Sequence, residues 1–241
     1  KAIETAREQV AAAFGTRPAE VVFTSGGTEA DNHAVKGLYE LRHTQDSTRT
    51  VVVTTAIEHP AVRDTVAWLV QHGAERMLLP MTAEGVVDFE LAADLLRSNA
   101  NRIALVSVMW ANNELGTIQP IAELAGLCNE LELPLHTDAV QAAAFEQLDF
   151  DRHGLAAAAV SGHKLGAPQG IGALLLQRAI TLEPLLHGGG QERQVRSGTL
   201  DVPAIAAFAL ATELAVAEQE DHARRLTELR RLLAGVVVVS R

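Results

Sequence analysis

The chain has 241 residues, of which 48 % are hydrophobic and 21 % are charged, and these fractions are typical of a globular protein. The length suffices for one large domain or two modest ones. The formal net charge of −10 argues against nonspecific binding to nucleic acid or to an anionic membrane, although a local phosphate site remains possible.

The sequence contains a single cysteine, Cys128, which excludes an intrachain disulfide and a multi-cysteine metal site; no metal site is expected. We therefore expect a reducing, cytoplasmic setting. No apolar stretch is long and uncharged enough to span a bilayer, and residues 1–4 lack the apolar core of a signal peptide. Because the chain opens inside an apparent helix without a start signal, we expect it to be a fragment or to be trimmed upstream.

The pattern of apolar residues predicts short buried strands that alternate with helices. A first helix is expected over residues 2–14, and further helices over 28–41, 60–72, 88–97 and 120–131. Strands are expected at 21–24, 51–54, 77–79, 103–108, 135–137, 155–160 and 171–176. This alternation predicts an α/β fold of three layers: a mainly parallel seven-stranded sheet with helices on both faces. Ligands bind such sheets beyond the carboxyl ends of the strands.

The C-terminal part of the sequence is expected to differ from the rest. A long helical region is predicted from about Val202 to Leu233, and the run 235–239 predicts the start of another strand. A strand at this point indicates that a second, smaller domain follows. We therefore divide the chain into an N-terminal helical segment (1–15), a large domain (16–205), and a long helix with the truncated start of a small C-terminal domain (206–241).

Lys164 lies in the segment Ser161-Gly162-His163-Lys164, directly after the predicted strand 155–160. An unpaired ammonium at the end of a buried strand is costly, and an imine to an aldehyde cofactor removes that charge. Ser161 and His163 could donate to a phosphate or hold the lysine. The alternative is a surface lysine in a loop, although the loop contains more glycines than a solvated loop needs.

A predicted strand is followed by two glycines and then by a helix start in the segment Thr24-Ser25-Gly26-Gly27-Thr28-Glu29. The glycines allow close approach of a ligand, and the free N–H groups of the helix start attract an anion. We expect Thr28 to cap the helix and to donate to a phosphate. The alternative is a tight turn with a threonine cap and no ligand.

Polar residues also follow two other predicted strands. His59, held by the following Pro60, could stack on an aromatic cofactor, or could be a surface histidine before a helix. Asn112 and Asn113 are turn formers that could also bind a cofactor oxygen.

Asp138 ends the buried strand near 135–137, where an unpaired carboxylate is costly. A protonated pyridine nitrogen is a suitable partner because that pairing keeps the ring an electron sink. Gln141, three residues further on, could reach the phenolic side of the same ring. The alternative for Asp138 is the N-cap of a following helix.

The triple glycine at 188–190 is either a hinge or an anion-binding nest. Arg196, a few residues further on, could bind a carboxylate or order the loop. Each of these features is ambiguous alone, but their joint order at strand ends points to one cofactor site.

These residues resemble the cysteine desulfurases, which belong to the class V aminotransferase group of the fold type I superfamily of pyridoxal 5'-phosphate (PLP) enzymes. The combination of SGHK with GGGQER and RSGTL is specific and indicates the bacterial iron–sulfur-cluster branch. The similar segments cover the chain almost end to end and are TSGGTEADNHAVKG (24–37), EHPAV (58–62), ANNELGTIQP (111–120), HTDAVQA (136–142), SGHKLGAPQGIGALLL (161–176) and GGGQERQVRSGTLDVPAI (188–205).

The resemblance implies that the large domain binds PLP and assigns a role to individual residues. Lys164 forms the imine with the cofactor and moves protons, His59 stacks on the ring, and Asp138 pairs with the ring nitrogen. The implied contacts to the phenolic oxygen come from Asn113 and Gln141, and those to the phosphate from Gly27, Thr28, Ser161 and His163. Thr199 is implied to reach the phosphate site of a neighbouring subunit, so the resemblance implies a homodimer; the role of Arg196 is left open.

The implied activity converts L-cysteine to L-alanine and passes the sulfur to an enzyme cysteine as a persulfide. A sulfur-acceptor or scaffold protein then receives it for iron–sulfur cluster or thio-cofactor synthesis. The persulfide cysteine and the arginine that grips the substrate carboxylate lie, in this family, beyond the position of Arg241. Cys128, inside a predicted helix, is expected to be a packing residue. The alternatives are a related selenocysteine or C–S lyase, a class V aminotransferase, and a non-catalytic scaffold.

Overall fold

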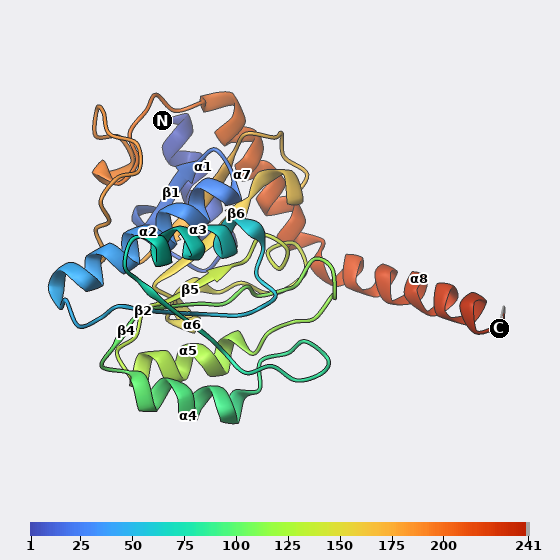
Figure 1. The fold of residues 1–241 in the computed structure, drawn as a ribbon. Coiled ribbons are helices and arrows are strands. Elements are labelled where there is room, and N and C mark those ends of the chain that lie inside the picture. The colour runs from blue at the N-terminus through green and yellow to red at the C-terminus, as the bar shows by residue number, and fades with distance from the viewer. Residues whose placement is uncertain (240–241) are drawn as a thin grey trace.

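The computed structural model describes residues 1–239, and its strands form one seven-stranded sheet in the order β1-β7-β6-β5-β4-β2-β3 (Figure 1). The strands are β1 (Val21–Thr24), β2 (Val51–Thr54), β3 (Glu75–Leu78), β4 (Ile103–Ser107), β5 (Leu135–Asp138), β6 (Ala157–Ser161) and β7 (Gly172–Leu176). Strand β7 is antiparallel to β1 and β6, and the other neighbouring pairs are parallel. The predicted, mainly parallel sheet is therefore confirmed.

The helices follow the predicted ones to within a few residues, apart from a short helix, α6, that was not expected. They are α1 (Ala2–Ala13), α2 (Gly27–Gln45), α3 (Pro60–Gln71), α4 (Phe89–Asn99), α5 (Ile121–Glu130), α6 (Phe150–His153), α7 (Val202–Ala217) and α8 (Gln219–Val239). Three short 3-10 helices complete the described structure: η1 (Pro18–Glu20), η2 (Gly162–Lys164) and η3 (Glu192–Gln194).

The sheet lies between two layers of helices, with α2 and α3 on one face and α4 and α5 on the other (Figure 1). Successive side chains of a strand point to opposite faces, and the burial of β1 follows this rule. Val21 and Phe23 join the core that contains α1, α4, α5 and α7, whereas Val22 joins the core under α2 and α3. Both cores are rich in alanine and branched aliphatic residues, and the three-layer prediction is confirmed.

The C-terminal region differs from the prediction in two respects. The single helical region expected from Val202 is interrupted at Glu218, and α8 leaves the body of the molecule (Figure 1). The strand expected at 235–239 is wrong, because α8 continues to Val239. A strand needs a neighbour for its backbone hydrogen bonds, whereas a helix satisfies them within the segment; none of the seven described strands pairs with this run. The limits proposed for the large domain, 16 and 205, remain a prediction.

Among the described residues, no single helix has the length and apolar character needed to cross a membrane. Helices α7 and α8 meet these requirements only as a pair, and the pair is bent by 63°.

All strands except β7 run in the same direction, so their carboxyl ends meet at one edge of the sheet. The polar segments selected from the sequence follow β1, β2, β4, β5 and β6 at this edge. The topology therefore brings them together although up to 140 positions separate them along the chain.

Candidate functional site

A cavity of about 200 Å³ opens at the carboxyl edge of the sheet. Its lining includes every predicted site residue except Thr199, and adds three residues that were not predicted: Asp31, Met109 and Val140. The predicted residues in the lining are Gly27, Thr28, His59, Asn113, Asp138, Gln141, Ser161, His163 and Lys164. Among the described residues, no group of three or more His, Cys, Asp or Glu side chains is placed to hold a metal ion.

The glycine loop after β1 forms one wall of the cavity. The prediction that Thr28 caps α2 is wrong, because the helix already begins at Gly27 with Gly26 in the cap position and no side-chain cap. Gly26 has a φ of 151°, which is unfavourable for residues with a side chain, and the helix begins two residues earlier than it would with Thr28 in the cap position. With no side-chain cap, the N–H groups of the first turn remain available to an anion at the cavity wall.

Gly27 is also required by close packing. A Cβ atom at this position would lie 2.5 Å from Cγ2 of Val140 and 3.4 Å from Cβ of Ser161. The absence of a side chain therefore allows three segments, after β1, β5 and β6, to meet at one point of the cavity.

The segment after β6 presents Lys164 at the cavity. Strand β6 ends at Ser161, and the 3-10 helix η2 carries Lys164 away from the sheet, so that this residue is exposed. The expectation of a costly buried ammonium is therefore wrong, because the turn moves the side chain to the cavity mouth. Oγ of Ser161 lies 2.8 Å from Nδ1 of His163, and both side chains line the cavity with Lys164.

Asp138 is one of two buried acids that line the cavity, with 5 % of its surface exposed. Its Oδ1 accepts a hydrogen bond from the backbone N–H of Val140 at 2.9 Å within a turn, and the helix-cap alternative is wrong because the next helix, α6, begins only at Phe150. Burial raises the pKa of Asp138 to about 7, and a negative charge on the nearby Asp31 acts in the same direction. A cationic group in the cavity would stabilise the ionised form of Asp138 against burial and against repulsion from a neighbouring carboxylate. A protonated ring nitrogen is such a group.

His59 and Asn113 complete the lining from β2 and β4. The His59 ring caps α3, since its Nδ1 accepts a hydrogen bond from the N–H of Ala61 at 3.1 Å, yet the ring still lines the cavity. The sequence allowed either asparagine to form a turn or to bind a cofactor oxygen, and in the structure each is placed for one of these roles. Asn112 is buried and forms the turn, donating to the Ile57 carbonyl at 2.8 Å, whereas Asn113 lines the cavity.

Arg196 orders its loop by binding a carboxylate of the protein itself. Its Nε lies 2.9 Å from Oε1 of Glu29, and Oε2 of Glu29 accepts from the N–H of Ser25 at 2.7 Å. Burial acts to raise the pKa of Glu29, but the hydrogen bonds from Arg196 and Ser25 outweigh it and the pKa lies below its usual value. Thr199 is exposed and does not line the cavity of its own chain.

The loop that carries Arg196 is fixed by a second set of contacts. Glu192, Arg193 and Gln194 have φ values of 45°, 62° and 64°, a left-handed turn that side chains normally disfavour. The buried Glu192 binds Arg7 at 2.6 Å and accepts from the N–H of Phe23 at 2.8 Å. Arg193 donates to four backbone carbonyls, those of Ala19, Leu176, Arg178 and Ile180.

Glu58, a buried carboxyl whose role the sequence did not reveal, lies directly before the lining residue His59 and is 5 % exposed. Its Oε1 accepts from Oγ1 of Thr55 at 2.7 Å and from the N–H of Met109 at 3.0 Å. Burial raises the pKa of Glu58 to about 8, so this carboxyl carries a proton at neutral pH. A signal for Asp31 did exist, since it is an acidic residue on the same buried face of α2 as Ala30 and Ala34.

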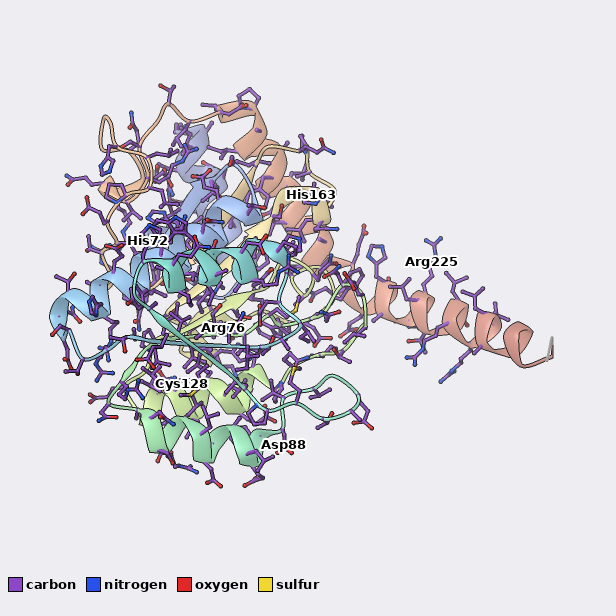
Figure 2. The ribbon with its side chains drawn as sticks, in the orientation of Figure 1. His72, Arg76, Asp88, Cys128, His163 and Arg225 are labelled. Carbon is purple, nitrogen blue, oxygen red and sulfur yellow. The ribbon has the colours of Figure 1, made fainter. Side chains whose placement is uncertain are left out.

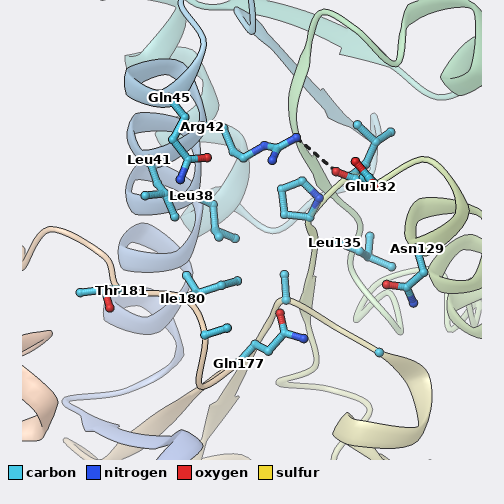
Figure 3. A pocket seen from close by; sticks show the side chains of 15 residues that line it. Leu38, Leu41, Arg42, Gln45, Asn129, Glu132, Leu135, Gln177, Ile180 and Thr181 are labelled. Atoms are coloured by element: carbon cyan, nitrogen blue, oxygen red, sulfur yellow. Dashed lines mark hydrogen bonds between the residues drawn. The ribbon is translucent and has the colours of Figure 1, made fainter.

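A larger cavity of about 430 Å³ lies at the opposite edge of the sheet, near the end of α2 and the start of β5 (Figure 3). Arg42 points into it and donates from Nη2 to the backbone carbonyl of Glu132 at 3.1 Å. These two are the charged residues of its lining, which otherwise consists of aliphatic residues, amide side chains, glycine and Thr181. It therefore lacks the combination of base, acid and anion site found at the carboxyl edge.

Cys128 lies on α5 and is a packing residue, as predicted (Figure 2). Its side chain is 1 % exposed and belongs to the core between α5 and the sheet. Burial raises the pKa of the thiol to about 12, so the nucleophilic thiolate is scarce at neutral pH.

The aminotransferase class-V profile matches residues 1–234, and the chain therefore belongs to the aminotransferase class-V family. Enzymes of this family depend on PLP. Over 237 residues, 98 % of this chain, it is 51 % identical to the IscS-like cysteine desulfurase of Mycobacterium tuberculosis, and it spans 60 % of the length of that relative.

Two solved structures extend the comparison. DndA from Streptomyces lividans superposes with a TM-score of 0.88 at 38 % identity, over 98 % of this chain and 66 % of that one. SspA in complex with cysteine superposes with a TM-score of 0.82 at 36 % identity, over 88 % of this chain and 60 % of that one. The likeness confirms the fold predicted for the large domain of PLP fold type I.

Proposed function

We propose that the protein is a PLP-dependent cysteine desulfurase, which converts L-cysteine to L-alanine and passes the sulfur to an enzyme cysteine as a persulfide. The observation that carries the proposal is the single cavity in which Lys164, Asp138 and His59 meet the glycine loop. The relatives support the substrate class, since the M. tuberculosis protein is named a cysteine desulfurase and SspA was solved with cysteine.

The cavity fits the cofactor at both ends. At one end the uncapped start of α2 and the side chains of Ser161 and His163 supply hydrogen-bond donors for a phosphate. At the other end, the carboxylate of the buried Asp138 would be stabilised by a cationic partner, because burial raises its pKa. When bound, PLP supplies an aldehyde for amines and a ring that withdraws electrons from the substrate α-carbon.

The residues of the chain then have separate tasks. Nζ of Lys164 would hold the cofactor through its aldehyde and would move the proton at the substrate α-carbon. The carboxylate of Asp138 holds the ring nitrogen in its protonated form, and the ring of His59 covers one face of the cofactor. Asn113 and Gln141 bind the phenolic oxygen.

Exposed Thr199 lies outside the cavity of its own chain, which supports a homodimer in which this residue completes the partner's phosphate site. Co-expression of Lys164→Ala with Thr199→Ala tests this arrangement. A mixed dimer contains one site with both native residues, so activity should exceed that of either variant alone. Equal inactivity of the mixture and of both single variants, with the mixed dimer isolated, would contradict a shared site.

We further propose that the enzyme works in the cytoplasm and delivers its sulfur to an acceptor or scaffold protein for iron–sulfur cluster or thio-cofactor synthesis. The single, buried cysteine of the chain supports a reducing compartment, and the class of relatives supports the sulfur transfer.

The decisive experiment fixes PLP onto the full-length protein with borohydride and locates the labelled lysine by mass spectrometry. In this chain the lysines are Lys1, Lys36 and Lys164, and we expect the label on Lys164 alone. Lys36→Ala is the matched control, because Lys36 packs on the Trp68 ring at 4.6 Å and should not affect labelling. Labelling of another lysine would contradict the site, and cofactor-loaded protein that releases no sulfide from L-cysteine would contradict the activity.

A further inference from the structure

A chain of three buried side chains lies beside the cavity and crosses β5, the strand that carries Asp138. Oγ of Ser107 on β4 lies 2.9 Å from Nδ1 of His136 on β5. On the other side of the ring, Nε2 of His136 lies 3.4 Å from Oδ1 of Asp31 on α2. Ser107 and His136 are 0 % exposed and Asp31 is 1 % exposed, while Asp31 also lines the cavity.

The contact between His136 and Asp31 is the important one, because neither Nε2 nor Oδ1 has any other hydrogen-bond partner in the described structure. An unsatisfied buried polar atom is costly, so the two atoms depend on each other. Both would be satisfied by a single shared proton and a small contraction of the 3.4 Å separation.

Two arrangements of protons are possible. In the first, a protonated Asp31 donates to Nε2 of His136, and Nδ1–H donates to Ser107. In the second, an ionised Asp31 accepts from Nε2–H, and the Ser107 hydroxyl donates to Nδ1. The charges around the cavity distinguish the two arrangements.

Three buried carboxyls, those of Asp31, Glu58 and Asp138, are close enough for their charges to act on one another. The remaining titratable groups near them are His136, which burial keeps neutral by lowering its pKa to about 4, and three exposed residues of the cavity lining, His59, His163 and Lys164. Burial also raises the pKa of Asp31 well above its usual value. One negative charge among the three carboxyls is therefore the favourable state.

We propose that Asp31 is a protonated positioning residue, which donates to Nε2 of His136 and leaves Asp138 as the one charged carboxylate on the cavity floor. This inference rests on the proposed function, since the single charge is matched to a single protonated ring nitrogen. Glu58 follows the same logic: its Oε1 accepts two hydrogen bonds and its Oε2, which has no partner, is free to carry the proton.

The protonation of Asp31 is tested on the full-length protein without cofactor, by infrared difference spectroscopy at neutral pH. A protonated carboxyl has a carbonyl band that a carboxylate lacks, and Asp31→Asn should remove one such band. Asp94→Asn, at an exposed position on α4, is the matched control and should remove none. If the wild type and Asp31→Asn have the same protonated-carboxyl bands, Asp31 is ionised and the inference is overturned.

The positioning role is tested by titrating the same variants with PLP. Asp31→Asn keeps a neutral donor toward Nε2, so we expect the dissociation constant of PLP to stay within about two-fold of the wild type. Asp31→Leu keeps the shape but removes the donor, and we expect affinity to fall about ten-fold or more. Unchanged affinity in Asp31→Leu, or equal loss in both variants, would overturn the role.

The variant Ser107→Ala and the infrared spectrum test the inference even if Asp31→Leu does not fold or PLP does not bind. If Asp31→Leu does not fold, Ser107→Ala breaks the chain at its other end, and the same ten-fold loss of PLP affinity is expected; unchanged affinity would overturn the inference. The infrared result does not depend on PLP. A failure of the wild type to be labelled at Lys164 would therefore reject the proposed function, separately from the protonation of Asp31.

Discussion

Nε of Arg196 lies 2.9 Å from Oε1 of Glu29, and this contact joins two segments that are 167 residues apart. Glu29 belongs to the first turn of α2, where we place the cofactor phosphate, and Arg196 belongs to the loop that presents Thr199. Both side chains are largely buried, with 16 % and 13 % of their surfaces exposed. The pair therefore fixes the loop relative to the phosphate site.

We predict that Arg196→Leu lowers the free energy of unfolding by about 1.5–3 kcal/mol, because the largely buried carboxylate of Glu29 loses a charged hydrogen-bond partner. Urea denaturation of the full-length protein measures this change. Arg63→Leu is the control, since Arg63 and Asp64 also form a 2.9 Å pair but are 56 % and 67 % exposed, and the expected loss is below about 0.5 kcal/mol. Equal effects of the two substitutions would contradict the role of Arg196.

The second prediction concerns Gly27, where a Cβ would lie 2.5 Å from Cγ2 of Val140. Gly27→Ala should displace Val140, whose N–H holds Oδ1 of Asp138, and should weaken PLP binding about ten-fold and stability by about 1–3 kcal/mol. Absorbance titration with PLP measures the first effect and urea denaturation the second.

The double variant Gly27→Ala/Val140→Ala removes the clashing methyl and should recover most of the PLP affinity. Gly126→Ala is a matched control in helix α5, because a Cβ there meets no atom within 4 Å, and it should stabilise the protein by about 0.5–1 kcal/mol. A double variant as defective as Gly27→Ala would show that the clash with Val140 is not the cause.

Most of the fold could be predicted from the sequence because its central strands are continuous runs of buried aliphatic residues. The strands at 21–24 and 51–54 match the structure residue for residue. The strand predicted at 235–239 was wrong for the opposite reason. β-Branched residues favour a strand only where a neighbouring strand can pair with them, and this run continues helix α8 instead. Local sequence does not contain that information.

The site was predictable where the functional residue lies at the carboxyl end of a strand, as do Asp138 and Ser161. It was not predictable where the role depends on contacts between distant segments. The ring of His136 needs Ser107 and Asp31 from two other elements, and the buried charge of Glu192 needs Arg7 from the first helix. These relationships appear only once the chain is folded.

The third prediction concerns the pH dependence of stability through Glu58, whose pKa burial raises from a usual value of 4.5 to about 8. Between these values the folded state binds a proton that the unfolded state has lost. The stability contributed by this group is therefore fully present below pH about 4.5 and is lost as the pH rises toward about 8, with a slope of up to ~1.4 kcal/mol per pH unit.

Glu58→Gln replaces the protonated carboxyl by a neutral group of the same shape, so its free energy of unfolding should fall less steeply over the same pH range. Urea denaturation of the cofactor-free protein between pH 5 and pH 8 measures both slopes. Exposed Glu90→Gln, in the first turn of α4, is the control and should leave the slope unchanged. Identical slopes for the wild type and Glu58→Gln would show that Glu58 is ionised in the folded protein.

The last prediction separates packing from sulfur chemistry at Cys128. The buried thiol, whose pKa burial raises to about 12, lies in the core between α5 and the sheet, whereas the cavity lies at the carboxyl edge of the strands. Cys128→Ala in the full-length protein should therefore leave sulfide release from L-cysteine within about two-fold of the wild type and cost about 1 kcal/mol of stability. Complete loss of sulfide release from a variant that still folds and binds PLP would identify Cys128 as the sulfur acceptor and overturn its assignment as a packing residue.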